Sequence, residues 1–313
     1  MTSNCNHTKV LCSLCALLAS ACGNYSNDDV DFALEQEAMP EQGDIEVKLQ
    51  VSVDQPNSAE YYKDTRSVVL TFNTMAGDLT GIIEGVRAYA PTSRSGDQRI
   101  WGPFPDDNHP GWEIRVVMRR SSASETLLHM DYWAQLRQVG QDDTGWVSLL
   151  VGQYTSQGGV RAGQGEIHFN VQDARLAGYP VDSDQGLREL DHIQVSYDNS
   201  GFPVQVTMEI VNLPTAKTQK ADYLYQRQAD DSGIMQFALQ AMTDAGQVTA
   251  TMTSRWRATG EGRADVVANT PNLQATLGTD CWGGDTVASY SYRLRDDVTL
   301  KTRNEGDPFS CVY

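Results

Sequence analysis

The sequence predicts an α+β domain that is mainly β: a curled or barrel-like antiparallel meander of about ten strands with one covering helix. Apolar and polar residues alternate through most of the chain after residue 112, a pattern typical of antiparallel strands with one buried face. Turn sequences rich in Asp, Asn and Gly separate several of these runs. A single segment shows helical spacing instead. These three observations carry the fold class.

The alternation is clearest where Ile193, Val195 and Tyr197 face one way and the polar residues between them face the other. The face that begins at Val204 repeats the pattern, and we expect it to include Val206, Met208, Ile210, Ile234 and Met242. The expected strands are 112–119, 127–138, 147–154, 167–171, 193–198, 204–210, 223–228, 234–242, 248–256 and 289–295.

Four turn sequences predict hairpins. They are DDTG at 142–145, DNSG at 198–201, DDSG at 230–233 and DAG at 244–246. In each we expect Asp or Asn to cap the turn and Gly to take the positive φ. Hairpins with matching chemistry make a meander the natural topology.

The helical segment is AGDLTGIIEGVRAYA, residues 76–90. Leu79, Ile83 and Val86 recur at helical spacing, Asp78 is a possible cap, and Pro91 ends the pattern. One apolar helix beside many strands must bury its stripe against the sheet. A closed or curled sheet would allow this burial and would also remove exposed strand edges.

The start of the chain predicts export. Residues 1–21 combine one basic residue, Lys9, with a short apolar run that ends in small residues, as a secretory signal peptide does. The run is too short to span a bilayer, which takes about 20 apolar residues. Ala19-Ser20-Ala21 before Cys22 fits an ordinary cleavage site and also resembles a lipobox, the signal for bacterial lipoproteins, although that signal usually has leucine at the position of Ala19.

Cysteine arithmetic favours lipidation of Cys22. After removal of the signal peptide three cysteines remain, an odd number for an oxidising compartment. A lipid on Cys22 leaves Cys281 and Cys311 to form a disulfide. By analogy with lipoprotein sorting, Gly23 after the cysteine favours the outer membrane, with its periplasmic or surface side left open.

Residues 22–44 then read as the lipidated cysteine and a flexible acidic tether, and residues 45–313 as a single β-rich domain. The formal net charge is −17, and it becomes −18 without residues 1–21. Such an acidic chain repels phosphate backbones, so no nucleic-acid partner is expected. The predicted contact with the lipid bilayer is through acylated Cys22.

Several sequences resemble a group of uncharacterised lipoproteins from myxobacteria. They are the lipobox-like start, RIWGPFPDD at 99–107, GEGRADV at 260–266, DCWGGD at 280–285 and EGDPFSC at 305–311. The resemblance supports the lipid anchor and the C-terminal disulfide. It implies no activity.

Catalytic signatures such as G-x-S-x-G, H-E-x-x-H and S-x-x-K are absent from the sequence, and C-x-x-C is absent after the predicted signal peptide. His129 and Asp131 share one face of an expected strand, where such neighbours are usually solvated. His168 is expected to be solvated as well. The segment 182–186 resembles a calcium loop but has Gly where a ligand is needed, so it predicts a turn. No metal or cofactor site is predicted.

The segment 101–112 is the candidate ligand loop. It gathers Trp101, Asp106, Asp107, His109 and Trp112 between the helix and the first confident strand. Tryptophans beside polar groups stack on sugars or close the mouth of a ligand site. Alternatively, the tryptophans plug the end of the sheet, which is the simpler interpretation.

These features predict an envelope lipoprotein with a non-catalytic, tethered β-domain that contacts other envelope components or has a structural role. The alternative is a carrier or receptor that holds a lipophilic ligand inside the curled sheet. A third hypothesis is a hydrolase with an unrecognised site, since catalytic groups assemble from distant residues. A cavity between the helix and the sheet would favour the carrier.

Overall fold

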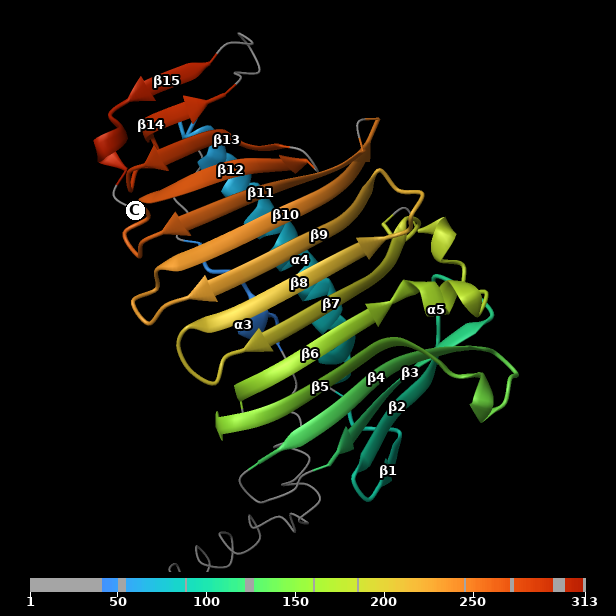
Figure 1. Cartoon of the computed structure of the whole chain (residues 1–313). Coiled ribbons are helices and arrows are strands. Elements are labelled where there is room, and N and C mark those ends of the chain that lie inside the picture. Colours follow the sequence, from blue (N-terminus) through green and yellow to red (C-terminus); the bar gives the residue numbers. More distant parts are fainter. Residues whose placement is uncertain are drawn as a thin grey trace, which may run out of the picture.

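The computed structural model describes residues 41–49, 55–87, 89–121, 127–159, 161–184, 186–244, 246–270, 273–294 and 302–311. The predicted signal peptide and Cys22 lie outside this part of the chain. Among the described residues, fifteen strands form one sheet in which each strand pairs with the next along the chain, and every pair is antiparallel (Figure 1). The meander predicted from the turn sequences is therefore present.

The strands are β1 (Ser93–Ser95), β2 (Gln98–Pro105), β3 (Trp112–Arg120), β4 (His129–Gln138), β5 (Val147–Gly159), β6 (Ala162–Asn170), β7 (Leu190–Asp198), β8 (Val204–Asn212), β9 (Thr218–Arg227), β10 (Gly233–Thr243), β11 (Gly246–Trp256), β12 (Gly262–Thr270), β13 (Leu273–Trp282), β14 (Ala288–Arg293) and β15 (Arg303–Gly306). All ten expected strands are present, and β1, β2, β12, β13 and β15 are additional.

The sheet is open, which corrects the expectation of a barrel-like sheet. Its edges are β1 and β15, and among the described strands these pair only with β2 and β14. The expected closure followed from the need to cover strand edges. The structure meets that need differently, since β1 and β15 are short and polar.

The covering helix is α4 (Glu60–Arg87), which begins well before the predicted residue 76. Its buried stripe extends back through Phe72 and Val69 to Thr65 and Tyr62. Thr65 interrupts the apolar pattern in the sequence. The Thr65 hydroxyl is nevertheless buried, because it bonds the Tyr61 carbonyl and the Ser254 hydroxyl, each at 2.6 Å. Because this core position holds a polar residue, the apolar pattern of the sequence did not predict the first half of the helix.

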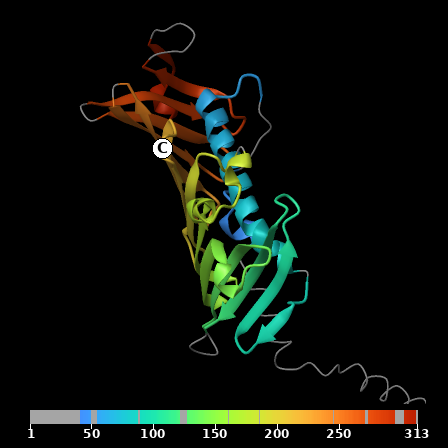
Figure 2. The same ribbon diagram turned by 90° about the vertical axis from the view of Figure 1, so that its right-hand side faces the viewer.

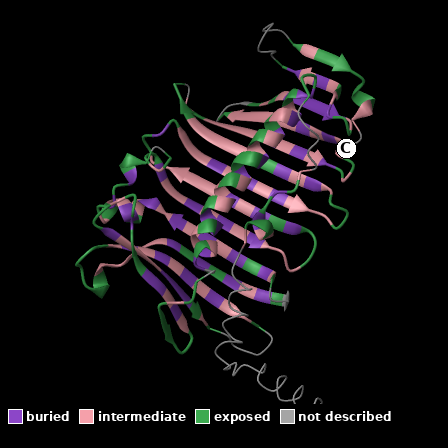
Figure 3. Cartoon of the chain, turned by 180° about the vertical axis from the view of Figure 1, so that it is seen from behind, coloured by how far each residue is buried: buried purple, intermediate pink, exposed green. Residues whose placement is uncertain are grey.

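The helix crosses one face of the sheet obliquely, and the strands beneath it carry many of the buried residues (Figures 2 and 3). We call this the inner face. Strand alternation places Val206, Met208, Tyr223 and Tyr225 on it, all of them buried. The core therefore lies along α4, with a main cluster and a second, smaller one that includes Tyr62, Met252 and Trp282, in place of a ring of side chains inside a barrel.

The opposite, outer face is polar and is not covered by any described helix (Figure 1). In β10 the buried residue on the inner face is Met235, so its neighbour Ile234 points to the outer face. Met242 also lies there and is exposed. Both residues were expected on the face of Val204, so that assignment was wrong for β10.

Short helices complete the fold. They are α3 (Gln42–Ile45), α5 (Val171–Leu176), η1 (Asp143–Gly145), η2 (Val181–Ser183) and η3 (Pro308–Ser310). α3 overlaps the end of the predicted tether and buries Ile45 against α4. The Asn73 side chain accepts from the Val47 amide (2.8 Å) and donates to its carbonyl (3.0 Å), which holds this segment on the helix.

The four turns lie between consecutive strands as expected, and Asp142, Asp198 and Asp230 accept hydrogen bonds from backbone amides two residues on. The glycine conformation was predicted correctly only in the last turn, where Gly246 has φ 105°. In DDSG the positive φ belongs to Asp231, because Gly233 is already part of β10.

The predicted disulfide joins Cys281 of β13 to Cys311, with a Cα–Cα distance of 5.5 Å. Cys281 is buried. The bridge therefore connects η3 and the end of the described chain to the sheet.

Candidate functional site

An apolar groove of about 410 Å³ runs along one flank of α4, above β6, β7 and β8. We call it the α4 groove. Its apolar lining comes from Met75, Leu79 and Ile82 of the helix and from Phe169, Leu187, Leu190, Ile193 and Ile210 below it. Asp78, Asp184 and Asn212 lie at its polar margin. Cavities of this size and character hold small organic molecules.

The groove exists because a straight helix lies on a twisted sheet. The helix covers the sheet fully only along its central stripe, where Phe72, Ala76 and Ile83 are buried. Met75 and Ile82 lie beside that stripe and are half-buried, as is Ile210 on the sheet. Apolar side chains therefore face one another across a space that no side chain fills.

A smaller groove of about 340 Å³ lies on the other flank, near the start of α4. Val68, Phe237, Leu239, Met252 and Val266 line it, together with Tyr61 and Asp64. Burial raises the pKa of Asp64; Arg293 opposes this rise, and the charges of Glu60 and Asp280 add to it. The α4 groove is larger and has more apolar walls.

The segment between α5 and β7 forms one wall of the α4 groove through Asp184, Leu187 and Leu190. Arg175, near the end of α5, holds this segment in place through hydrogen bonds. Its Nη2 donates to the carbonyls of Leu187 (3.1 Å) and Leu190 (3.2 Å), and its Nε donates to Asp182 (3.4 Å). The wall is thus built on an organised loop, which we call the α5–β7 loop.

The same loop closes on the turn between β2 and β3, where part of the candidate ligand loop lies. Asp106 is buried, and its Oδ2 accepts from the Tyr179 hydroxyl at 2.6 Å and lies 3.0 Å from His109 Nδ1. Its Oδ1 accepts from the amides of Asn108 (3.0 Å) and His109 (3.2 Å). The carboxylate is therefore surrounded by donors.

His109 and Tyr179 are in contact with each other as well. The Tyr179 hydroxyl lies 2.7 Å from His109 Nδ1, and the ring centroids are 4.6 Å apart. On the other side of the imidazole, Ser183 Oγ lies 3.5 Å from Nε2. The Ser183 hydroxyl also bonds the Pro180 carbonyl at 2.7 Å. Asp106 and Ser183 thus lie on opposite sides of the His109 imidazole, with Asp106 at Nδ1 and Ser183 at Nε2.

The electrostatics favour a charged Asp106 beside a neutral Tyr179. Burial alone would raise the pKa of Asp106, but hydrogen bonds from Tyr179, His109 and the Asn108 amide outweigh it and hold the pKa below the ordinary value. Burial and the Asp106 contact raise the pKa of Tyr179 well above that of a free tyrosine. Asp106 and the Tyr179 hydroxyl both contact Nδ1 of His109, so Nε2 is the ring nitrogen that faces Ser183.

In the structure, the residues of the candidate ligand loop do not form one site: two of them lie in a polar cluster, and the others are in the core or exposed. Asp106 and His109 are brought together, and Tyr179 and Ser183 join them from a loop about 70 residues further along. Trp101 is fully buried in β2, where its indole donates to the Tyr89 carbonyl at 2.9 Å. Trp112 begins β3 and packs edge-on against Tyr179. Both tryptophans are core residues, and Asp107 is exposed.

Tyr179 and Ser183 could not be found from the sequence. Ser183 lies in the DSDQG segment that was predicted to be a turn, and no motif connects it to His109. The only local signal was the proximity of Asp106 and His109 themselves, three residues apart on one turn.

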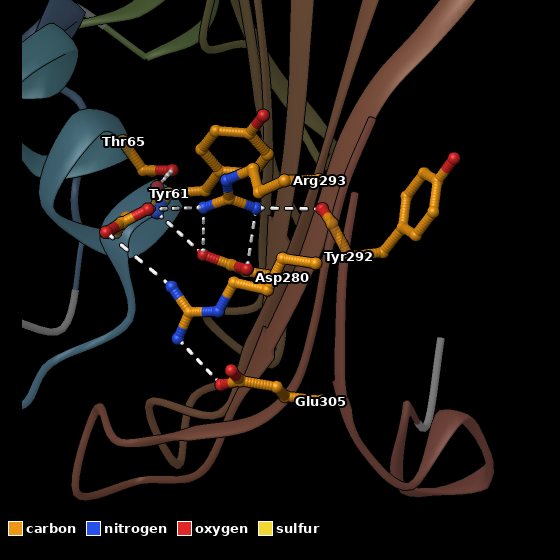
Figure 4. Close-up of polar contacts among 8 residues, drawn as sticks. Tyr61, Thr65, Asp280, Tyr292, Arg293 and Glu305 are labelled. Atoms are coloured by element: carbon orange, nitrogen blue, oxygen red, sulfur yellow. Dashed lines mark hydrogen bonds and ion pairs between the residues drawn. The ribbon is translucent and has the colours of Figure 1, made fainter. Parts of the chain in front are cut away.

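A buried ion cluster anchors the start of α4 to β13 and β14 (Figure 4). Arg293 donates two hydrogen bonds of 2.8 Å to Asp280 and one of 3.2 Å to Glu60, and its guanidinium lies 3.5 Å from the Tyr61 ring centroid. Asp280 also accepts from the Tyr61 amide at 2.9 Å. These contacts satisfy the guanidinium and the carboxylate within the protein, so we assign the cluster a structural role.

Two shallow hollows on the outer face share Ser196, Gln205 and Thr207. The first is lined mainly by amides, hydroxyls and carboxylates, whereas the second, of about 590 Å³, also has Met208, Tyr223, Leu224 and Ala238 in its walls. His129 and Asp131 share this face, as expected, and 3.3 Å separates His129 Nε2 from the Asp131 carboxylate. His168 is half exposed beside Glu166, as predicted for a solvated side chain.

Within the described residues there is no group of three His, Cys, Asp or Glu side chains that could hold a metal ion. Nor does any described helix have the length and apolar character needed to cross a membrane. Comparison with known proteins gives no relative: no family model, no curated protein and no solved structure matches the chain.

Proposed function

We propose that the chain is an exported envelope lipoprotein, anchored in the outer membrane through Cys22, whose sheet domain binds an apolar ligand in the α4 groove. The observation that supports ligand binding is the groove itself. Its walls are aliphatic and aromatic side chains from α4, three strands and the α5–β7 loop. Exposing such an apolar surface to water costs free energy, and an apolar occupant that covers the surface removes this cost.

The binding mode differs from the one expected from the sequence. An open sheet does not enclose a ligand between its strands, so the occupant lies between the helix and the sheet instead. The inner face of Val206, Met208 and Ile210 supports this mode, since Ile210 lines the groove while Val206 and Met208 are buried beside it. The groove favours a binding role over a purely structural one.

The anchor is supported by the signal sequence and by the pairing of Cys281 with Cys311, which leaves Cys22 as the odd cysteine of the exported chain. Lipid on Cys22 would hold the domain at a membrane, where apolar molecules concentrate. Two or more acyl chains make such anchoring long-lived.

Fluorescence of N-phenyl-1-naphthylamine, an uncharged apolar dye, tests the groove. The experiment uses the full chain with Cys22→Ser, so that no attached lipid competes. The dye should bind saturably. Ile210→Trp, which fills the groove, should weaken binding by about tenfold or more, equivalent to about 1.4 kcal/mol.

Val211→Trp is the matched control, because Val211 follows on the same strand but points to the outer face. It should change dye affinity by less than about twofold, which is under 0.5 kcal/mol. Absence of saturable binding would contradict the proposed function. Equal effects of the two substitutions would also contradict it, because the dye would then bind elsewhere.

A further inference from the structure

We propose that Ser183, His109 and Asp106 form a nucleophilic site that hydrolyses acyl esters. The inference adds a reaction to the proposed function, and it rests on that function only for the position of the acyl chain. The three side chains come from the α5–β7 loop and from the turn between β2 and β3. Their order, hydroxyl to imidazole to carboxylate, is the arrangement that activates a serine in unrelated folds.

The geometry gives each group a role. Asp106 is a positioning residue: it is buried, charged, and 3.0 Å from His109 Nδ1, so it fixes the tautomer whose Nε2 accepts a proton. Ser183 Oγ lies 3.5 Å from that Nε2 and is exposed to solvent. Catalytic hydrogen bonds of this kind are often long before substrate binds.

The hydroxyl proton of Ser183 must first turn from the Pro180 carbonyl to His109 Nε2. This requires only rotation about the Cβ–Oγ bond, because Pro180 and His109 both lie within 3.5 Å of Oγ. Tyr179 keeps the imidazole in place by contacting Nδ1 and Asp106 together.

The reaction has two balanced halves. Ser183 Oγ bonds to the acyl carbon while its proton passes to His109 Nε2; the ester C–O bond then breaks, and the leaving alcohol takes that proton. Water next attacks the acyl carbon and gives a proton to Nε2, the bond to Oγ breaks, and Ser183 recovers the proton. One ester and one water yield one carboxylic acid and one alcohol.

The surroundings indicate an ester with an apolar acyl chain. Asp184, the next residue after Ser183, lines the α4 groove, and Leu187 continues the groove wall. An acyl chain in the groove therefore runs beside the loop that carries the nucleophile. Arg188 Nε donates to the Asp182 carbonyl at 3.4 Å, which places a positive charge on that same loop.

The first test is covalent labelling of the full chain with a fluorophosphonate, followed by peptide mapping. The expected adduct is on Ser183, and Ser183→Ala and His109→Ala should abolish it. Ser232 is the control serine, since its hydroxyl donates to the Asp230 carboxylate (2.6 Å) on a different turn. Labelling of Ser183 and Ser232 to the same extent, or of neither, would overturn the proposal.

The second test is hydrolysis of p-nitrophenyl decanoate. His109→Ala should lower kcat by roughly 10²–10⁴-fold, the contribution of general acid–base catalysis, and Ser183→Ala should lower it at least as much. Asp106→Asn should lower kcat with little change in KM, whereas a merely structural role would change both together or neither. Full activity of Ser183→Ala would overturn the assignment.

Ile210→Trp separates this inference from the proposed function. It should raise KM for the decanoate by a much larger factor than KM for p-nitrophenyl acetate, because only the long chain reaches the groove. If Ser183 is labelled but Ile210→Trp changes neither dye binding nor the decanoate KM, the catalytic site stands and the groove function fails. If the dye binds in the groove but Ser183 is not labelled, the reverse holds.

Discussion

Tyr132 of β4 lies directly across from Gly152 of β5, and its ring occupies the space in which a side chain at Gly152 would begin. A Cβ placed on Gly152 would come closer than 3.0 Å to ring atoms of Tyr132. The same relationship recurs in the pairs Gly165–Tyr197, Gly233–Trp256 and Gly262–Trp282. A glycine opposite each of these large aromatic residues thus leaves room for the ring on the inner face.

Gly152→Ala should therefore destabilise the protein. Tyr132 is buried and cannot move into open space, so the added methyl group overpacks the core. Overpacking of this kind costs about 1–3 kcal/mol. Urea unfolding followed by tryptophan fluorescence measures the change in the free energy of unfolding.

Gly85→Ala is the matched control and should have the opposite sign. Gly85 lies exposed inside α4, and no atom would come within 4 Å of its Cβ. Alanine in a helix interior is more stable than glycine by about 0.5–1 kcal/mol. A neutral Gly152→Ala would show that the Tyr132 ring does not occupy the position described.

Asp106 should make stability depend on pH below about 5. Its folded-state pKa is lower than the ordinary 3.8, so its ionised form is favoured by folding. The contribution is fully present above the unfolded pKa and is lost as the pH falls through the folded pKa. Asp106→Asn should thus be less stable than the parent chain at pH 7, and the difference should shrink on acidification.

Asp107→Asn provides the comparison for Asp106→Asn, since Asp107 is the exposed neighbour. Its effect at pH 7 should stay within about 0.5 kcal/mol. Urea unfolding at several pH values between about 2 and 7 measures both variants. A difference for Asp106→Asn that persists or grows at pH 2 would be inconsistent with a lowered pKa.

Arg293→Met should be strongly destabilising, because it leaves the Asp280 carboxylate buried without its cation. The two side chains are only 8% and 1% exposed. Breaking a buried pair in this way costs about 3–5 kcal/mol. Arg119→Met, which breaks the exposed pair with Asp97, should cost no more than about 1 kcal/mol.

The double variant Arg293→Met/Asp280→Leu separates the effect of an unpaired buried charge from the effect of lost side-chain packing. Removal of both charges should recover part of the stability lost in Arg293→Met, since no buried charge remains. Purely additive losses in urea unfolding would show that Arg293 and Asp280 are not coupled.

Cys22→Ser should release the protein from the membrane fraction. In the proposed anchor the lipid attaches through the thiol of Cys22, and the apolar run before it is too short to span a bilayer. Sedimentation of cell envelopes followed by detection of the protein measures the release, with Cys15→Ser as the control within the signal peptide. Unchanged sedimentation of Cys22→Ser would contradict the lipid anchor.

The alternation of apolar residues located the strands of the central sheet because each of them has one buried face. It failed for β12 and β13, where the buried residues include Ala264, Gly278 and Asp280. Small or polar residues at inward positions leave no apolar signal. For the same reason the first half of α4 was not predicted, since the polar residue Thr65 occupies a core position there.

The candidate site was only partly readable because its groups come from two loops far apart in the sequence. Asp106 and His109 share one turn and were grouped from the sequence. Tyr179 and Ser183 reach them only because β3 to β6 return the chain to the same end of the sheet, and the α4 groove depends on how a helix crosses strands. Neither arrangement has a local sequence pattern.

Photolabelling with an alkyl diazirine tests the central claim most directly. The full chain carrying Cys22→Ser would be irradiated with the probe, digested and mapped by mass spectrometry. The account predicts that adducts concentrate on residues 75–82 of α4 and residues 187–193 beside it, and that Ile210→Trp removes them. Adducts spread over the outer face, or unaffected by Ile210→Trp, would contradict a ligand site between α4 and the sheet.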